Sequence, residues 1–276
     1  MIAAAIALGA SIAWGVGDFL GGLKARSLPA IAVIACSQPF GLALLAIVVA
    51  VRGRPAPGWS LLWACLSALL GTTGLFAFYR GLAIGAMAVV APIAGAAAVV
   101  PVAFGLATGE HPGALRELGF VLAIGGVILT SREPRTSRIR LAAGAGWGLL
   151  AMAAFGGYYV PLHEASRGDF LWASLVFRTT SVTLAWTALA LLRPRIPALR
   201  PHLPVLVAVG VLDTGGNVCF AAASTRGLIS VVSVLASLYP VGTVLLARAT
   251  LHERIARIQE AGVVATLTGV ALISAG

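Results

Sequence analysis

The chain has 276 residues, of which 59% are apolar and only 10% are charged, and its mean hydropathy is +0.99. Soluble domains are about 45–50% apolar and about 25% charged, so this composition excludes a soluble globular protein. It also excludes a disordered chain, because so many apolar residues must be buried. The formal charge is +10. All basic residues except Arg178 lie at the edges of apolar runs or between them, which indicates contact with lipid headgroups and argues against nucleic-acid binding.

Apolar runs long enough to cross a membrane recur along the whole chain. A hydrocarbon core about 30 Å thick requires about 20 helical residues. The connectors between the runs are short and rich in Arg, Pro and Gly. The sequence therefore predicts an all-α membrane protein with ten transmembrane helices. The predicted spans are 2–23, 29–51, 59–80, 84–108, 115–131, 141–162, 170–192, 203–224, 228–249 and 258–275.

The three cysteines, Cys36, Cys65 and Cys219, all lie inside these apolar runs. An odd number of cysteines without metal-ligand spacing indicates neither a disulfide framework nor a metal site. We interpret them as small packing residues. The four histidines lie at the ends of runs or in connectors. We therefore expect no metal ion and no cofactor.

The two halves of the chain resemble each other at a spacing of 141–143 residues. Each predicted half holds five spans, and because five is odd, halves that share a fold enter the membrane in opposite directions. This is the inverted-repeat plan of secondary transporters. We expect one repeat at 1–131, a basic linker at 132–140 and a second repeat at 141–276. The matching positions are Trp14-Gly15 with Phe155-Gly156, Arg52 and Arg54 with Arg193 and Arg195, Ala88 to Ala91 with Ser230 to Ser233, and Glu110, Glu117, Gly119 and Gly126 with Glu253, Glu260, Gly262 and Gly269.

Several of these residues resemble motifs of the drug/metabolite transporter superfamily, specifically its ten-helix EamA-type members. They are Trp14-Gly15, Arg178, Tyr239-Pro240 followed by Glu253, and the glutamates that open the fifth and tenth helices. The resemblance covers nearly the whole chain. It implies that helices 1, 3, 4, 6, 8 and 9 surround a central cavity and that helices 5 and 10 are peripheral. The chain departs from the family pattern at Cys36-Ser37-Gln38 in helix 2, at Pro92 and Pro101 in helix 4, and at Asp18.

The deepest ionisable residue is Asp213, about ten residues into its span, with Asn217 one turn further on the same face. An ionisable side chain near the bilayer centre costs about 2.5–3.5 kcal/mol, so it normally faces a cavity or a partner. Two interpretations are open: a substrate or proton site, or a structural pair with Arg178. For Arg178, an anchoring role is favoured over contact with substrate. Asp18 shares a helix face with Trp14, and we expect both to line the cavity. The alternative for Asp18 is pairing or snorkelling at the helix end, close to Lys24.

Four tyrosines complete the predicted substrate site. Tyr79, Tyr158 and Tyr159 lie late in their helices, and Tyr239 lies in mid-span beside Pro240. Because proline lacks an N–H and frees a carbonyl one turn back, Pro240 marks a broken helix, and Pro92 and Pro101 predict a similar interruption. Packing kinks are the alternative for all three prolines. Eight residues are thus predicted to bind substrate: Trp14, Asp18, Tyr79, Tyr158, Tyr159, Asp213, Asn217 and Tyr239.

Glu110 and Glu253 lie at the start of the connectors before the fifth and tenth spans. Carboxylates near helix N-termini are stabilised by the helix dipole, so we interpret both as structural or gate-closing.

The odd-numbered connectors carry thirteen basic residues and the even-numbered ones five. The positive-inside rule then places both termini outside the cytoplasm, whereas the family resemblance implies cytoplasmic termini. The orientation is open at this point.

These features favour a secondary transporter of small organic solutes in the cell (plasma or inner) membrane, working by alternating access with or without proton coupling. The sequence has no nucleotide-binding loop, which argues against a nucleotide-driven motor. The alternative is a membrane-embedded enzyme, although the sequence offers no candidate for a Ser–Lys dyad, since Lys24 is the only lysine. A cavity with carboxylates and aromatic rings suits amines or amphipathic cations. If Arg178 reaches the cavity, zwitterionic amino acids fit as well. The expected partners are a small-molecule substrate and membrane lipids, with a homodimer as one option and no nucleic acid.

Overall fold

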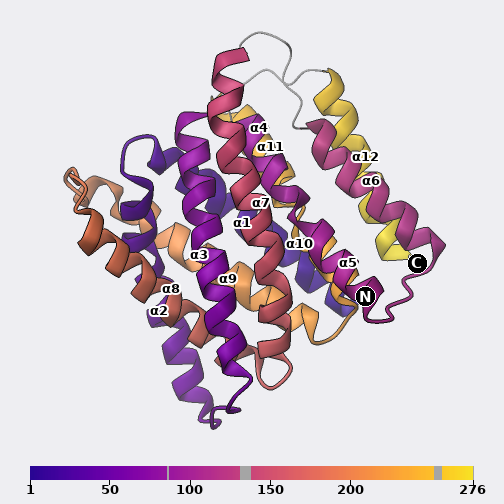
Figure 1. Ribbon diagram of the computed structural model, residues 1–276, viewed down its shortest axis with the longest axis horizontal. Coiled ribbons are helices and arrows are strands. Elements are labelled where there is room, and N and C mark those ends of the chain that lie inside the picture. The colour runs from indigo at the N-terminus through magenta and orange to yellow at the C-terminus, as the bar shows by residue number, and fades with distance from the viewer. Residues whose placement is uncertain (86, 131–137, 252–256, 276) are drawn as a thin grey trace.

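The computed structural model describes residues 1–85, 87–130, 138–251 and 257–275, and within these ranges all regular secondary structure is helical, with no strand. Figure 1 shows the helices as one bundle. The elements in chain order are α1 (Ile2–Ala25), α2 (Ala30–Arg52), α3 (Leu61–Ile84), α4 (Met87–Gly95), η1 (Ala96–Ala98), α5 (Val99–Ala107), α6 (Ala114–Thr130), α7 (Arg138–Ser166), α8 (Phe170–Leu192), η2 (Arg200–His202), α9 (Leu203–Ser224), α10 (Ile229–Ala236), α11 (Tyr239–Leu251) and α12 (Arg257–Ala275).

Membrane-crossing helices are evident from length and composition. Six stretches of the described chain are long and apolar enough to span a bilayer. Helix α7 begins at Arg138, so residues 138–140 of the expected linker are helical. The count of ten spans and the opposite orientation of the halves stay predictions. The six stretches are Ile2–Ala25, Ala30–Arg52, Leu61–Ile84, Phe170–Leu192, Arg200–Ser224 and Ile229–Ala247.

Two of the predicted spans are broken at corresponding places. The run 84–108 is divided by the 3-10 turn Ala96–Ala98, and the run 228–249 is divided between α10 and α11. Pro101 and Pro240 lie in the first turn of α5 and α11, respectively. The first N–H groups of a helix have no intrahelical acceptor, so proline costs little there. These two prolines therefore begin a helix rather than kink one, as the sequence predicted for an interrupted span. Pro92, which the sequence also singled out, lies inside α4 and does not mark the break.

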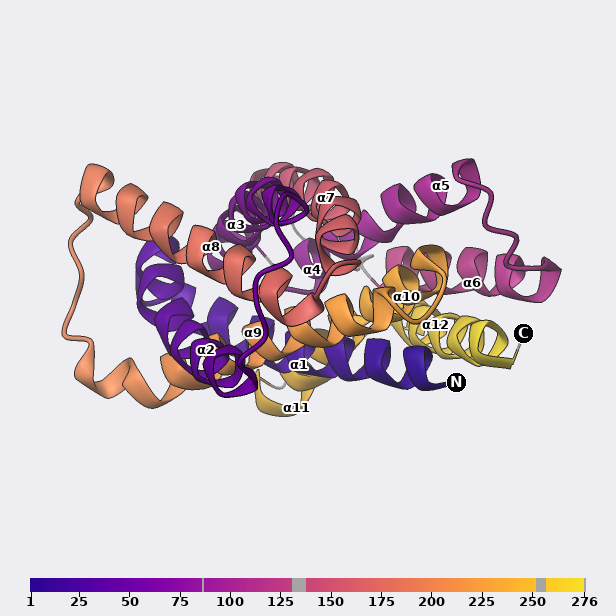
Figure 2. The same ribbon diagram turned by 90° about the horizontal axis from the view of Figure 1, so that it is seen from below.

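The helices pack in a pattern that survives exchange of the two halves. Helix α1 packs on α9 and α3 packs on α7, while α2 contacts α9 and α3 contacts α8. The predicted repeat relates α1 to α7, α2 to α8 and α3 to α9. Exchanging these counterparts turns the α1–α9 contact into the α7–α3 contact, and the α2–α9 contact into the α8–α3 contact. The contacts of α2 with α8 and of α6 with α12 become themselves. Figures 1 and 2 show α6 and α12 side by side at one edge of the bundle.

Glycines permit the closest approach between helices. A Cβ at Gly210 of α9 would collide with the backbone carbonyl of Ser37, and a Cβ at Gly41 of α2 would collide with the Thr214 side chain and the Gly210 carbonyl. Small residues at such crossings let helix backbones approach closely in a membrane, where dispersion forces and hydrogen bonds replace the hydrophobic effect. The glycines therefore fix the distance between α2 and α9, which both reach the centre of the bundle.

One ion pair joins the end of α2 to the start of α8. The Asp169 carboxylate lies 2.7 Å from Nη1 of Arg52 and accepts hydrogen bonds from the backbone N–H groups of Leu171 and Trp172, so it also caps α8. Burial alone would raise the pKa of Asp169. The hydrogen bonds from Arg52 and the two N–H groups, together with the Arg52 charge, outweigh it and lower this pKa below its ordinary value of 3.8.

This lowered pKa predicts a small acid-sensitive contribution to stability. A carboxyl whose pKa is depressed by folding stabilises the protein above its unfolded pKa, and the contribution is lost as the pH falls through the folded pKa. We expect a loss of about 1 kcal/mol between pH 5 and pH 2. The melting temperature of the detergent-solubilised protein should fall more over this range than that of Asp169→Asn, which keeps the cap. An equal fall in both proteins would contradict the assignment.

Candidate functional site

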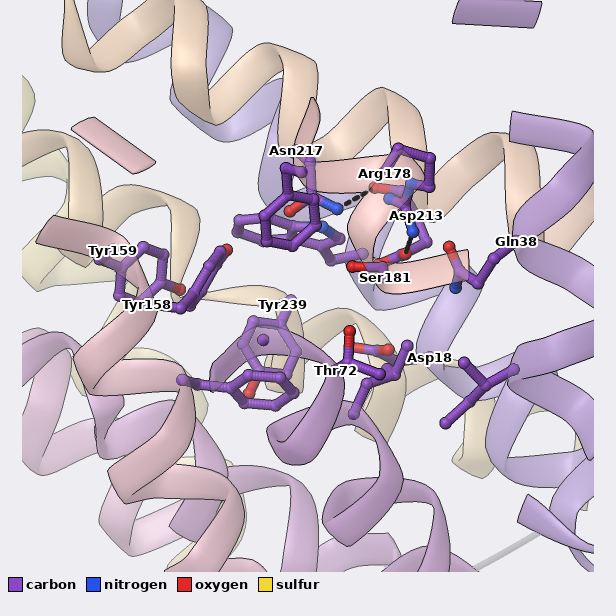
Figure 3. Close-up of a pocket in the computed structure, with 16 residues that line it drawn as sticks. Asp18, Gln38, Thr72, Tyr158, Tyr159, Arg178, Ser181, Asp213, Asn217 and Tyr239 are labelled. Carbon is purple, nitrogen blue, oxygen red and sulfur yellow. Dashed lines mark hydrogen bonds and ion pairs between the residues drawn. The ribbon is translucent and has the colours of Figure 1, made fainter. Parts of the chain in front are cut away.

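A cavity of about 40 Å³ lies at the centre of the bundle. Its walls come from seven helices, α1, α2, α3, α7, α8, α9 and α11, and therefore from both halves of the chain. Figure 3 shows Gln38, Ser181, Arg178 and Asp213 toward one side and Tyr158 and Tyr159 toward the other. The lining residues are Trp14, Asp18, Ile34, Gln38, Gly71, Thr72, Leu75, Phe155, Tyr158, Tyr159, Phe177, Arg178, Ser181, Asp213, Asn217 and Tyr239.

An ion pair between α8 and α9 dominates the polar side of the cavity. Nη1 of Arg178 donates a hydrogen bond of 2.8 Å to Oδ2 of Asp213, and the arginine side chain is only 2% exposed. The Asn217 amide donates to the backbone carbonyl of Asp213 at 2.9 Å, which orients the Asn217 side chain. The ion pair that the sequence offered as one alternative is therefore present, and it also faces the cavity.

Several buried polar atoms around the cavity lack a protein partner. Among the described residues, nothing hydrogen-bonds to Nε or Nη2 of Arg178, to either amide atom of Gln38, or to the hydroxyls of Thr72, Ser181 and Tyr239. A buried polar group without a hydrogen bond costs about 1–3 kcal/mol, so native proteins keep few of them. Their concentration around one cavity indicates a place where polar groups of a bound molecule or water are expected to complete the hydrogen bonding.

Asp18 adds a second carboxylate to the cavity. It is 6% exposed, and no described side chain or backbone N–H donates a hydrogen bond to it. Asp213 is neutralised by Arg178, whereas Asp18 has no counter-charge of its own. An isolated buried carboxylate is strongly disfavoured in its ionised form. The geometry therefore separates the two aspartates, one committed to an ion pair and one available to a proton or a cation.

Aromatic rings form the opposite wall around Trp14. The Trp14 ring centroid lies 6.4 Å from that of Tyr158 and 6.3 Å from those of Tyr159 and Tyr239. The Tyr159 hydroxyl is 2.9 Å from Oγ of Ser237, at the break between α10 and α11. Such rings offer apolar surface and, through their faces, attraction for cations. One half of the cavity is thus polar and the other aromatic.

The two sequence motifs at Trp14-Gly15 and Tyr239-Pro240 meet in space. A Cβ at Gly15 would lie 2.9 Å from the carbonyl oxygen of Tyr239. The Thr243 hydroxyl is 3.1 Å from the Gly15 carbonyl oxygen, to which it donates. Gly15 therefore lets α11 approach α1 at the start of the broken helix, and this contact places Tyr239 against Trp14.

Comparison with known proteins identifies the family. The family model described as "EamA-like transporter family" matches residues 1–132 and again 142–275. The chain belongs to the EamA-like transporter family. Its two matches coincide with the two predicted repeats. A solved structure described only as "Crystal structure of protein" matches with a TM-score of 0.76 at 16% identity, covering 98% of this chain and 95% of that one, which shows a shared fold. No curated protein matches the chain.

Eight of the twelve residues singled out in the sequence line the cavity of this EamA-like protein. Tyr79 is buried behind it, with its hydroxyl against Gly21 of α1. Pro240 follows the lining residue Tyr239. Glu253 lies outside the described residues. Glu110 is remote from the cavity: its carboxylate accepts hydrogen bonds of 2.6 and 3.0 Å from the N–H groups of Ile229 and Ser230. The eight are Trp14, Asp18, Tyr158, Tyr159, Arg178, Asp213, Asn217 and Tyr239.

The set of helices around the cavity differs from the set that the family resemblance implied. Helices 2 and 7 (α2 and α8) contribute Ile34, Gln38, Phe177, Arg178 and Ser181. Helix 4, which the structure describes as α4, η1 and α5, contributes no lining residue. The reason is packing: α2 and α8 contact each other and also α9 and α3, respectively, whereas α4 lies against α7 and α11.

Lining positions also match across the repeats at the spacing of 141–142 residues. The chemistry at the matched positions is unequal, because the second half supplies the ion-pair carboxylate and the amide where the first half has glycine and leucine. The cavity therefore has the same framework on both sides but a different chemical lining. The matched pairs are Trp14 with Phe155, Asp18 with Tyr159, Gly71 with Asp213, and Leu75 with Asn217.

Proposed function

We propose that this EamA-like membrane protein is a secondary transporter that carries a small organic solute, such as an amino acid, an amine or a drug-like compound, through the central cavity. The observation that carries the proposal is the set of unpartnered buried polar atoms facing an aromatic wall at the boundary between the two halves. Ligand sites in proteins combine apolar walls with a few polar groups that fix orientation. Membership of the family supports transport as the activity, and the cavity is the proposed binding site for the solute.

The size and position of the cavity support a mechanism of alternating access. A volume of about 40 Å³ is enough for about three water molecules, at about 10–15 Å³ each. An organic solute therefore enters only when helices of the two halves separate. The packing pattern that survives exchange of the halves supports two inverted repeats, 1–131 and 141–276, that rock against each other around a fixed site. The cell membrane is the proposed location.

Glu110 is proposed to hold the two halves together at one end of the protein when that end is closed. It belongs to the connector after α5, and it binds the first N–H groups of α10, in the other repeat. A Cβ at Gly105 would collide with the Glu110 carboxylate, so the glycine leaves room for the contact between Glu110 and α10. Because the contact joins the two halves, we expect it to form when this end of the protein is closed and to separate when the end opens.

Asp18 is the proposed coupling residue. The charged and titratable groups that surround it are Asp213 on α9, Arg178 on α8, and the tyrosines Tyr79, Tyr159 and Tyr239 on α3, α7 and α11. Arg178 is committed to Asp213 at 2.8 Å, so Asp18 forms no full ion pair with any residue that the structure describes. A proton or the cationic group of a substrate would neutralise it, which links solute movement to proton movement.

Thiol chemistry at neighbouring positions tests whether the cavity is the transport path. Thr72 lines the cavity, whereas Thr73 is exposed on the outer face of α3. In a background with Cys36, Cys65 and Cys219 replaced by serine, we expect a methanethiosulfonate reagent to abolish flux through Thr72→Cys and to leave flux through Thr73→Cys within about two-fold. Because the reagent acts after folding, loss of flux reports a blocked path. Equal flux in both treated variants would contradict the proposal.

A further inference from the structure

The free edge of the Arg178 guanidinium has a geometry suited to one kind of ligand. Nη1 is bound to Asp213, but Nε and Nη2 have no partner in the described chain, and the side chain is 2% exposed. These two atoms lie on the same edge of the planar group and donate in parallel. Paired parallel donors match the two oxygens of a carboxylate in a bidentate hydrogen bond.

Two further side chains beside Arg178 have unpartnered polar atoms. Ser181 lies three residues on along α8, on the same face as Arg178, and its hydroxyl has no hydrogen bond. Gln38 comes from α2, which packs against α8; it is fully buried and neither amide atom is bonded. In Figure 3 the Gln38 and Ser181 side chains lie on the same side of the cavity as Arg178. A hydroxyl and an amide NH₂ are both donors that a carboxylate accepts.

Nothing in the described part of the chain explains why these atoms are left unpaired. Replacing a buried unpaired amide by an apolar side chain of similar size is neutral or stabilising, so folding alone does not require Gln38 or Ser181. Arg178 therefore uses only part of its hydrogen-bonding capacity, since Nη1 binds Asp213 while the edge formed by Nε and Nη2 is unoccupied. Besides the Arg178–Asp213 ion pair, the cavity is lined by Asp18, whose ionised form has the sign opposite to Arg178.

We propose that Nε and Nη2 of Arg178, together with Ser181 and Gln38, form a subsite for the carboxylate group of the transported solute. This inference rests on the proposed transport function and narrows its substrate class. The solute carries a carboxylate, which binds the Arg178 subsite. Where it also carries an ammonium group, that group binds Asp18, and its apolar part lies against Trp14 and the tyrosines. Amines without a carboxylate bind much more weakly.

The test compares carboxylates with their carboxamides, which keep the size and the ammonium group but lose the negative charge. The probes are leucine, phenylalanine and lysine and the three corresponding amino acid amides. Uptake is measured by counterflow in proteoliposomes, and binding is measured by the shift in melting temperature of the detergent-solubilised protein. For at least one pair we expect the wild-type protein to move and bind the acid, with the amide at least about ten-fold weaker, as loss of a charged hydrogen bond implies.

Three variants assign the effect to the subsite. We expect Gln38→Met and Ser181→Ala each to lower the apparent affinity for the acid by about ten-fold. Their melting temperatures without ligand should stay equal to wild type or rise, because each removes an unpaired buried polar atom. Thr179→Val, on the exposed side of the same helix, is the matched control and should change neither quantity. A purely structural role predicts the reverse, with lower melting temperatures and unchanged affinity.

The outcomes separate this proposal from the transport function. Amides that move as well as the acids, or variants with unchanged affinity, would overturn the carboxylate subsite and leave transport standing. If no compound moves but the acids alone raise the melting temperature, the subsite stands and the transport function fails. If the acids neither move nor shift the melting temperature, the subsite is wrong.

Discussion

Replacing Asp213 by asparagine is expected to lower the free energy of unfolding by about 3–5 kcal/mol and to abolish transport. The substitution leaves the Arg178 guanidinium buried, 2% exposed, without its counter-ion at 2.8 Å. Breaking a buried ion pair from one side costs this much because the remaining charge is left uncompensated. Thermal unfolding in detergent and counterflow in proteoliposomes measure the two effects. A melting temperature equal to that of wild type would contradict the role of the pair.

Asp18→Asn is the matched control, because it is the same chemical change in the same cavity. Asp18 has no hydrogen bond or ion pair with any described residue, so its loss should leave the melting temperature unchanged or raise it. We expect counterflow to persist, with a weaker apparent affinity for solutes that carry an ammonium group, while accumulation driven by a pH gradient is lost. Gradient-driven accumulation in Asp18→Asn at the wild-type level would exclude Asp18 as the coupling residue.

Gly210→Ala is expected to lower the free energy of unfolding by about 1–3 kcal/mol, the usual cost of overpacking a close contact. The added Cβ would collide with the Ser37 carbonyl, a backbone atom that moves only if α2 shifts. Because the shift also displaces Gln38, flux should fall with stability. Gly215→Ala, one turn further along α9, has open space at the Cβ and should be neutral or gain up to about 1 kcal/mol from helix propensity. Equal stability of the two variants would contradict the α2–α9 packing.

The sequence predicts the helices well because apolar runs and their breakers are local signals. The prolines at 101 and 240 mark the broken helices, and the 141–143 spacing marks the repeat that both family matches follow. The ionisable residues in mid-span were also informative, because a charge in hydrocarbon needs a cavity or a partner. Asp213 and Arg178 have both, which the sequence alone left as alternatives.

The polar, uncharged lining residues were harder to find. Gln38, Thr72 and Ser181 are single residues in apolar helices, and one hydroxyl or amide gives no periodic pattern. Their importance depends on which face of α2, α3 or α8 points to the centre, and that is decided by packing between distant segments. Gln38 did carry a signal, since an amide in mid-span needs partners as a charge does. The place of helix 2 at the cavity likewise followed from the close α2–α9 crossing rather than from any local motif.

Counterflow in proteoliposomes is the most direct test of the central claim that the cavity carries a small solute across the membrane. Vesicles holding the purified protein are loaded with a mixture of unlabelled amino acids, polyamines, nucleosides and quaternary amines, and entry of each labelled compound is followed. We predict saturable entry of at least one carboxylate-bearing class, absent from protein-free vesicles and blocked in the reagent-treated Thr72→Cys variant. Folded protein that exchanges none of these compounds above the protein-free level would contradict the account.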